Sequence, residues 1–306
     1  MPALFVVFFA LVLDRLLGEP KKYHPLAGFG NLAQKIENWL NQDSKANLNH
    51  RLSGLIALVI LVAPFVLIAA YLSSVHWLFD LALLTLAIGW QSLREHSLAI
   101  YHTLLENNLE LARKKVGMIV SRDTSELNEE QICKASIESV LENGADAIFS
   151  ALFWFIIAGA PGVVAYRLVN TLDAMWGYRT PRFLHFGWAA ARLDDVMNFI
   201  PSRLTALSYF IASRNLNAIK CWQIQAKTWK SPNAGPVMAA GAGGLNLELG
   251  GEAVYHGETQ QRPVLGNGRK AKSSDIPTAL SLITHSIIVW LITLAVITGV
   301  IHYASV

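Results

Sequence analysis

The sequence predicts an all-α integral membrane protein, a polytopic helical bundle with one broken or re-entrant segment and with cytoplasmic helical or loop regions. Two observations support this prediction. Apolar residues make up 53% of the 306 residues and charged residues only 15%, a composition too apolar for an ordinary soluble domain of this length. In addition, several segments of about 20 residues contain few or no charges, which is long enough for a helix to cross a bilayer.

The N-terminal half predicts one short embedded helix and a helical hairpin. Met1 to Leu13 is apolar but short, and it lacks the basic leader and small-residue cleavage pattern of a signal peptide. We therefore expect a retained helix within or on the membrane. Residues 52–75 and 75–93 follow as two candidate spans, in which Asp80 is the only charged residue. Because almost no loop separates them, they predict a tight hairpin.

Residues 147–166 are the candidate broken segment. They are long enough to cross, but Gly159-Ala160-Pro161-Gly162 interrupts them with residues that weaken or break helices. A full crossing would also place Arg167, Arg179, Arg182 and Arg192 outside, against the rule that basic loops stay cytoplasmic. We therefore expect a re-entrant or bent segment that turns at residues 159–162. Residues 196–212 are a further candidate embedded segment, and 278–304 form the last span.

Basic residues set the expected orientation. The hairpin turn, Ser73 to His76, has no Lys or Arg, whereas both flanking arms are basic. Both arms are therefore expected in the cytoplasm, which gives cytoplasmic segments at 18–51, 94–146 and 213–277 of one membrane domain, 1–306, in the cell inner membrane. The flanking basic residues are Lys21, Lys22, Lys35, Lys45, Arg51, Arg94, Arg113, Lys114 and Lys115.

Several classes of function are disfavoured. The net charge is only +3, and the basic residues form no compact stripe with aromatic residues, so a nucleic-acid partner is not expected. Cys133 and Cys221 are too few and too far apart for a disulfide framework or a thiolate zinc site. The chain contains neither a His-Glu-x-x-His zinc motif nor a Gly-x-Ser-x-Gly nucleophile motif.

An acidic row precedes the broken segment. Asn128 with Gln131 resembles a capping box, so a helix is expected from there towards Asn143. On that helix Glu138, Glu142 and, if the helix continues, Asp146 are spaced by four residues and repel one another. An arginine or a bound magnesium ion would offset the repulsion. An ordinary solvated helix face is an equally good interpretation.

Two polar clusters follow the broken segment, in or beside apolar sequence where charges need a partner, a wet cavity or a ligand. They could supply arginines for phosphate and carboxylates for magnesium, although a structural salt-bridge network would use the same residues. The first contains Arg167, Asn170, Thr171, Asp173, Gly177, Tyr178 and Arg179; the second contains Arg192, Asp194, Asp195 and Arg203. Glycine-rich sequence after Ser231–Gly235 predicts a mobile loop that closes over a ligand.

Several ordered motifs are spread over nearly the whole chain. They are Leu13–Pro20 with His24-Pro25, Ser121–Thr124, Glu138–Asn143, Val169–Met175, Gly177–Arg179, Phe186–Arg203, Ser231–Gly235 and Arg262–Gly266. With these motifs the chain resembles the adenosylcobinamide-phosphate synthase (CobD/CbiB) family of cobalamin biosynthesis. After Gly235 it departs from the family pattern, because Pro236-Val237 stands where an aromatic or His residue and Pro-Glu usually follow.

The resemblance implies an ATP-dependent amide-forming ligase. It would join aminopropanol, or its phosphate, to a propionate of adenosylcobyric acid, a corrinoid substrate that contains cobalt, with Mg²⁺ and ATP. Partner enzymes of the late corrinoid pathway and the lipid bilayer are further expected partners. The residues expected to orient metal or amine are Glu138, Glu142, Asp173, Asp194 and Asp195, with Glu142, Asp194 and Asp195 as the metal ligands. Those expected to bind phosphate, carboxylate or the corrinoid amides are Arg122, Asn143, Arg167, Asn170, Arg179, Arg192, Arg203 and Asn233.

Two other functions stay open. A transporter would explain a broken apolar segment flanked by charges, but transporters usually have paired repeats and polar residues within their spans. This chain places its polar residues between the spans. The departure after Gly235 also leaves open a catalytically altered membrane partner or sensor of the same fold.

Overall fold

The computed structural model describes residues 3–20, 25–41, 48–255 and 258–304, so Lys21, Lys22, His24 and Lys45 lie outside the described residues. The chain divides into two compact units. Unit 1 contains Met1–Gly89 and Ser150–Asn198, and unit 2 contains Trp90–Phe149 and Phe199–Val306. Each unit is therefore built from separated stretches of the chain, which a sequence read as one domain does not reveal.

Unit 1 is helical. Helix α8 packs against α2, α3 and α4, and α4 also packs against α1. The expected N-terminal helix is confirmed as α1, although its position in a membrane stays a prediction. The helices of this unit are α1 (Ala3–Leu17), α2 (Pro25–Leu40), α3 (Leu48–Val75), α4 (Trp77–Ala87), α8 (Ala151–Trp176) and the first part of α9 (Trp188–Ser213).

The hairpin of α3 and α4 is confirmed, but its second arm is shorter than expected. The His76 ring accepts a hydrogen bond from the Leu78 amide at 3.2 Å and caps α4. Helix α4 then ends at Ala87, because Ile88 has an extended backbone with ψ of 140° and Gly89, a poor helix former, follows. The expected continuous helix over 75–93 is thus wrong: α5 (Trp90–Leu105) is a separate helix that belongs to unit 2.

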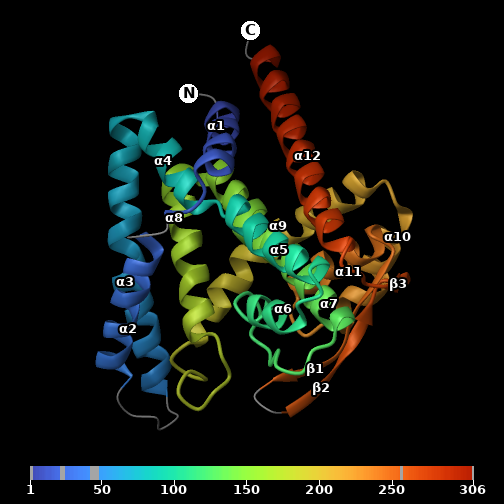
Figure 1. Ribbon diagram of the computed structural model, residues 1–306. Helices are drawn as coiled ribbons and strands as arrows, with labels where there is room; N and C mark the ends of the chain where they lie inside the picture. Colours follow the sequence, from blue (N-terminus) through green and yellow to red (C-terminus); the bar gives the residue numbers. More distant parts are fainter. Residues whose placement is uncertain (1–2, 21–24, 42–47, 256–257, 305–306) are drawn as a thin grey trace. The chain divides into compact units, whose positions relative to one another are not determined.

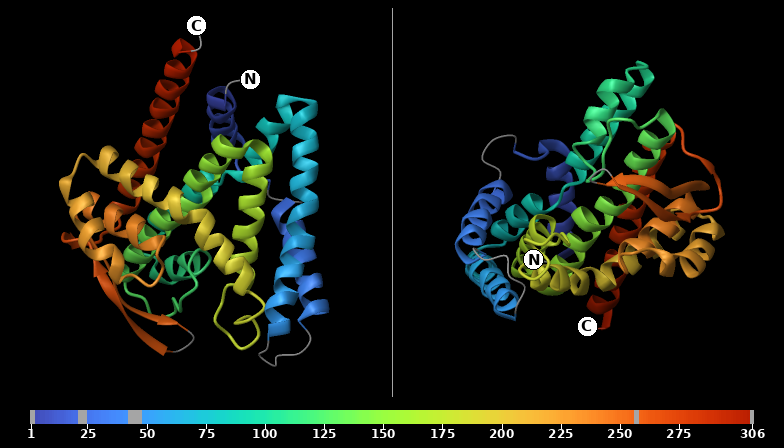
Figure 2. Two further views of the ribbon diagram at one scale, coloured as in Figure 1. Left: turned by 180° about the vertical axis from the view of Figure 1, so that it is seen from behind. Right: turned by 90° about the horizontal axis from the view of Figure 1, so that it is seen from below.

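Helix α8 bends sharply where the sequence predicts a break. Ala158 and Gly159 have non-helical backbone angles, and Gly159 has φ of +63°, which L side chains rarely adopt. Pro161 has no N–H to donate within the helix. A Cβ on Gly162 would lie 2.5 Å from the Trp154 carbonyl oxygen, so glycine permits the tight turn. Figure 2 (left) shows the ribbon of α8 turning back at this point.

Unit 2 combines helices with a small sheet (Figure 1). Its central helix is α7, which packs against α5, α11 and α12. The predicted capping box is present at its start, where the side chains of Asn128 and Gln131 bond each other's backbone N–H. The further elements are α6 (Leu109–Val116), α7 (Glu129–Gly144), α10 (Leu216–Gln225), α11 (Ala234–Gly244), α12 (Asp275–Ala304), and the π and 3₁₀ segments η1 (Ala145–Ser150) and η2 (Ala226–Thr228).

The three-stranded sheet shows that the fold is not all-α. Strands β1 (Leu247–Tyr255) and β2 (Glu258–Leu265) are antiparallel, and β3 (Arg269–Lys270) pairs in parallel with β1. Leu247 and Leu249 alternate into the core, as in a half-buried strand. The alternation is short because Gly250 and Gly251 follow, both with φ of +76°. The register shifts between these two glycines, since Gly250 pairs with Val264 and Gly251 with Arg262, which leaves Pro263 of β2 as the extra residue of a bulge.

The glycine-rich sequence after Ser231–Gly235 is also not a loop. It forms α11, whose residues are almost all buried, including Pro236 and Val237. A Cβ on Gly235 would lie 2.3 Å from the Ala226 carbonyl oxygen, and one on Gly243 would lie 2.4 Å from that of Asn217. These glycines therefore allow close packing of α11 against its neighbours. The expected mobile loop over this segment is wrong.

Within the part of the chain that the structure describes, three helical stretches are long and apolar enough to cross a membrane: His50–Val75, Glu129–Trp176 and Asp275–Ala304. The first and last agree with the spans that the sequence predicts at 52–75 and 278–304. The second contains α7, η1 and the bent α8. The protein is thus mostly helical, with three candidate spans.

Candidate functional site

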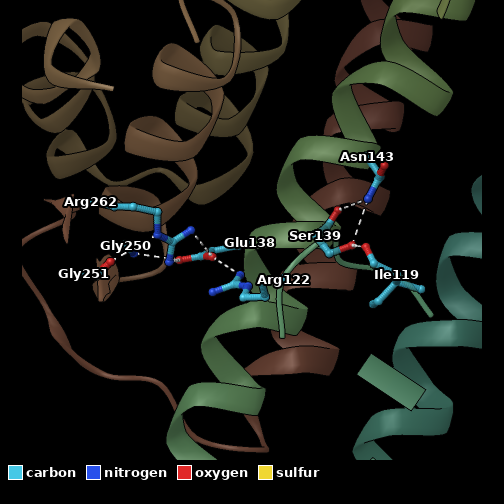
Figure 3. Close-up of polar contacts among 8 residues, drawn as sticks. All are labelled: Ile119, Arg122, Glu138, Ser139, Asn143, Gly250, Gly251 and Arg262. Carbon is cyan, nitrogen blue, oxygen red and sulfur yellow. Dashed lines mark hydrogen bonds and ion pairs between the residues drawn. The ribbon is translucent and has the colours of Figure 1, made fainter. Parts of the chain in front are cut away.

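The most tightly bonded polar cluster of unit 2 surrounds Glu138 on α7, whose side chain is only 4% exposed. Its carboxylate accepts hydrogen bonds from Arg122, from both Nη atoms of Arg262 at 3.0 and 3.2 Å, and from the Gly250 amide at 2.7 Å. Figure 3 shows Glu138 between the two guanidinium groups. We call Glu138, Arg122 and Arg262 the arginine cluster. Both oxygens of this buried carboxylate are therefore satisfied by hydrogen-bond donors, two of them charged.

Three separate elements position this cluster. Arg122 lies in the loop before α7, and the next residue fixes that loop because the Asp123 amide donates to the Val254 carbonyl at 2.9 Å. Arg262 lies on β2 opposite Gly251 of β1, and its Nε donates to the Gly251 carbonyl at 3.1 Å. At the register shift, Gly250 thus directs its amide to Glu138 and Gly251 directs its carbonyl to Arg262.

The next turn of α7 carries two further predicted residues, Glu142 and Asn143, which are both exposed. The Asn143 side chain donates to the carbonyl and the hydroxyl of Ser139, and that hydroxyl donates to the Ile119 carbonyl (Figure 3). Glu142 makes no hydrogen bond or ion pair with the described residues. The expected acidic row ends here, since η1 changes the helical repeat before Asp146.

A second arginine site in unit 2 joins α9 to the start of α11. Nη1 of Arg203 donates to the Asn233 side-chain oxygen at 3.1 Å, and Nη2 donates to the Pro232 carbonyl at 3.1 Å. Trp229 lies near both the arginine cluster and the start of α11. Its ring is 5.4 Å from the guanidinium carbon of Arg262, and its side chain lies close to both Gly235 and Gly250. The predicted residues Arg203 and Asn233 are thus in direct contact.

In unit 1 the predicted residues gather around Asp194 of α9. We call Asp194, Asn170 and Asn198 the amide cluster. Asn170 and Asn198 each donate a side-chain N–H to Asp194, at 3.1 and 3.0 Å. The Asn198 oxygen in turn accepts from Ser150 at 2.7 Å and Tyr166 at 3.1 Å. Burial raises the pKa of Asp194, and these two amide bonds oppose the rise.

The other predicted residues of unit 1 surround this cluster less closely. Asp194 and Asp195 lie near enough to Asp173 to repel its negative charge. Nε of Arg167 is buried and has no hydrogen-bond partner among the described residues. Arg179 and Arg192 are exposed, and no contact with the amide cluster is seen for either.

The sequence predicts that Glu142, Asp194 and Asp195 bind magnesium. The described residues contain no group of three His, Cys, Asp or Glu side chains arranged to hold a metal ion. Magnesium in phosphoryl-transfer sites is commonly held by only one or two carboxylates together with substrate phosphates and water. Asp194 and Asp195 fit that smaller requirement within unit 1. Glu142 belongs to unit 2, so its action on the same ion stays a prediction.

Sequence reasoning missed several members of these clusters. Arg262 is the most important, because it was noticed only as part of a motif although it supplies three hydrogen bonds. In the sequence, Arg262 stands out only as a charged residue that precedes Pro263 and a short apolar run. The same pattern is common in ordinary loops. Ser150, Tyr166 and Asn198 were missed because uncharged polar residues in apolar helices are common packing residues.

Comparison with known proteins gives a consistent result. The family model described as CobD/Cbib protein matches residues 7–283. The protein named cobalamin biosynthesis protein CobD from Stutzerimonas stutzeri is 52% identical, covering 96% of this chain and 97% of its own length. Proteins of the same name from Chromobacterium violaceum and Mycobacterium tuberculosis are 50% and 38% identical, covering 96% and 90% of this chain and 97% and 90% of their own lengths. No solved structure matches the chain.

Proposed function

The chain belongs to the CobD/CbiB protein family, and from this membership and its two polar clusters we propose that it catalyses an amide-forming step of cobalamin biosynthesis. In this step aminopropanol, or its phosphate, is joined to a propionate of adenosylcobyric acid with consumption of ATP. The relatives' names support a role in cobalamin biosynthesis. The choice of step rests on the sequence motifs and on the chemistry of the clusters.

The observation that best supports this proposal is the arginine cluster. Arg122, Glu138 and Arg262 come from three separate sequence motifs and meet in one place, where paired guanidinium groups are held by a buried carboxylate. Paired arginines are well suited to phosphate and carboxylate groups. ATP and aminopropanol phosphate carry phosphate groups, and adenosylcobyric acid carries the propionate carboxylate. Only unphosphorylated aminopropanol carries neither group.

The proposed chemistry activates the propionate before the amine attacks. A propionate oxygen takes the γ-phosphoryl group of ATP, so that an acyl phosphate and ADP form. The amine nitrogen then bonds to the acyl carbon, the phosphate leaves with the bonding electrons of the broken C–O bond, and the nitrogen loses a proton. Such transfer requires positioning and cationic groups around the phosphates more than a protein nucleophile.

The residues then take complementary roles. In unit 1, Asp194 and Asp195 would hold magnesium, with Asp173 nearby, and the ion would supply charge neutralisation for the phosphates of ATP. Asn170 orients Asp194 through its hydrogen bond. In unit 2, Arg203 and Asn233 are hydrogen-bonded to each other at the start of α11 and would bind carboxylate or amide groups of the corrinoid. Arg167, Arg179 and Arg192 stay candidates for phosphate binding.

We further propose a multi-pass arrangement in the cell inner membrane. The three apolar helices and the basic arms of the α3–α4 hairpin support it, with α8 bending so that Arg167 and Arg179 stay on the cytoplasmic side, where ATP is present. Partner enzymes of the late corrinoid pathway would meet the protein on that side. External labelling of a cysteine at Thr180 in intact cells should fail, and efficient labelling would contradict this topology.

Product analysis tests the reaction itself. Purified protein in lipid nanodiscs, given adenosylcobyric acid, aminopropanol phosphate and Mg-ATP, should yield a corrinoid product heavier by the added amine less water, with ADP and phosphate. We expect Asp194→Asn to reduce the rate by at least about 100-fold, because a neutral amide cannot replace a metal-binding carboxylate. Unchanged substrate mass in the wild-type reaction would favour a transporter or a non-catalytic partner instead.

A further inference from the structure

Two residues on opposite sides of the α8 bend bond the same atom of α9. The Asn198 side-chain oxygen accepts a hydrogen bond from the Ser150 hydroxyl at 2.7 Å and from the Tyr166 hydroxyl at 3.1 Å. Ser150 precedes Asn198 by 48 residues and Tyr166 precedes it by 32. In a straight α-helix this difference of 16 residues corresponds to about 24 Å along the axis. The bend at Ala158 and Gly159 therefore brings the two donors together (Figure 2, left).

The surroundings of Asn198 fix the direction of its amide. Asn198 is 3% exposed, and Ser150 and Tyr166 are fully buried. The Asn198 side-chain N–H donates to the Asp194 carboxylate at 3.0 Å. The reverse orientation would place the amide oxygen against a carboxylate oxygen, and the two would repel each other. An amide oxygen has two lone pairs and accepts both hydroxyl bonds, so all three partners favour the same orientation.

Asp194 keeps acceptor positions that these amides do not use. Asn170 donates to its Oδ1 and Asn198 to its Oδ2, so each oxygen retains one of its two lone pairs. Burial raises the pKa of Asp194, and the two amide bonds oppose the rise. Within the described part of the chain Asp194 makes no ion pair. The carboxylate is thus held in a fixed direction by neutral donors, which suits a ligand of a cation.

We propose that Asn198 is a positioning residue for the magnesium site, and that the bend of α8 serves to hold it. Its amide sets the direction of the Asp194 carboxylate, while Ser150 and Tyr166 hold that amide through its oxygen. Asn198 would not touch the ion, because its N–H group points at Asp194 and magnesium binds oxygen atoms. This inference rests on the proposed function for the assignment of magnesium to Asp194.

Binding of Mn²⁺ to full-length protein in nanodiscs of zwitterionic lipid tests the positioning without catalysis. Mn²⁺ prefers the same oxygen ligands as magnesium, and electron paramagnetic resonance measures the free ion. The wild type should bind Mn²⁺, and Asp194→Asn should abolish this binding. Ser150→Ala combined with Tyr166→Phe should weaken it by about tenfold or more, as expected when a metal ligand loses its outer partners. Each single variant should stay within about twofold of the wild type, because one hydroxyl still holds the amide.

Two further variants separate positioning from packing. Asn198→Leu nearly keeps the side-chain volume but removes the amide, and it should weaken Mn²⁺ binding as much as the double variant. Trp154→Phe is the matched control, because it removes another hydrogen bond between α8 and α9, from the Trp154 indole N–H to the Met197 carbonyl at 3.0 Å. It leaves the bonds of the Asn198 amide in place, so its affinity for Mn²⁺ should equal that of the wild type.

The outcomes also distinguish this inference from the proposed reaction. Wild-type affinity in the double variant or in Asn198→Leu would overturn the inference, and so would equal weakening by Trp154→Phe or wild-type binding that does not depend on Asp194. If the wild type forms the amide although the Asn198 variant binds Mn²⁺ normally, the positioning is wrong while the reaction stands. If all variants bind as expected but no amide forms, the reaction is wrong and the positioning stands.

Discussion

The arginine cluster holds the buried carboxylate of Glu138 and the amide cluster holds the half-buried carboxylate of Asp194, and they do so in different ways. In unit 2, Glu138 is bonded by two guanidinium groups, so its charge is cancelled and a net positive charge remains. In unit 1, Asp194 is bonded by the neutral amides of Asn170 and Asn198, so its charge is solvated but not cancelled. The difference teaches that the first cluster is suited to anions and the second to cations, although both centre on a carboxylate.

The largest expected effect follows from removing the charge of Glu138. Glu138→Gln should lower the free energy of unfolding by about 3–5 kcal/mol, because two arginines lose the buried partner that compensates them. Denaturant unfolding in mixed micelles measures this. The matched control is Glu110→Gln, which breaks an exposed pair with Lys114 and should leave stability nearly unchanged, because water screens such pairs. Similar values for both variants would mean that burial of the arginine cluster is not energetically important.

An intermediate effect on the free energy of unfolding is expected at Ser150 and Tyr166, which bond the amide cluster through Asn198. Ser150 and Tyr166 donate to the same oxygen of Asn198, so either donor alone can keep that amide oriented. Ser150→Ala and Tyr166→Phe should each cost about 0.5–1.5 kcal/mol. The double variant should cost more than their sum, because a buried carbonyl then loses both donors. Strict additivity would show that the two bonds act independently.

The smallest effect on stability is expected at Asp194 itself. Asp194→Asn should change the free energy of unfolding by about 1 kcal/mol or less, since neutral amides surround the carboxylate and removing a buried charge offsets a lost hydrogen bond. The same unfolding assay, beside Glu138→Gln, measures it. A loss as large as that of Glu138→Gln would remove the distinction between the clusters. Together with the expected loss of activity, a small change would mark Asp194 as functional.

Local signals were read correctly from the sequence. The capping box of Asn128 and Gln131 lies within four residues, and the break of α8 depends on Gly159 and Pro161 themselves. Both features follow from the backbone chemistry of nearby residues. The first arm of the α3–α4 hairpin and its turn were also predictable, because an uninterrupted apolar run specifies its own helix, whereas the end of α4 at Ala87 was not predicted.

The incorrect sequence predictions concern features that depend on packing between residues far apart in the chain. Glycines 235 and 243 suggest a loop, but they are needed because α11 passes close to the carbonyls of Ala226 and Asn217. The strands were missed because Gly250 and Gly251 interrupt the alternation of β1. Arg262 was missed as a site residue because nothing near it in sequence indicates its partner. These features depend on tertiary contacts, and the local pattern of a single sequence does not identify the partners in such contacts.

The pairing of β2 with β1 also affects how this chain folds while it is being translated. Arg122 is only 16 residues from Glu138, but Arg262 follows it by 124. During translation, Glu138 therefore has one arginine until β2 has been made and folded onto β1. Contacts of such long sequence separation form late. The cluster is completed only when most of the chain exists, so a nascent chain that ends before β2 lacks a finished cluster.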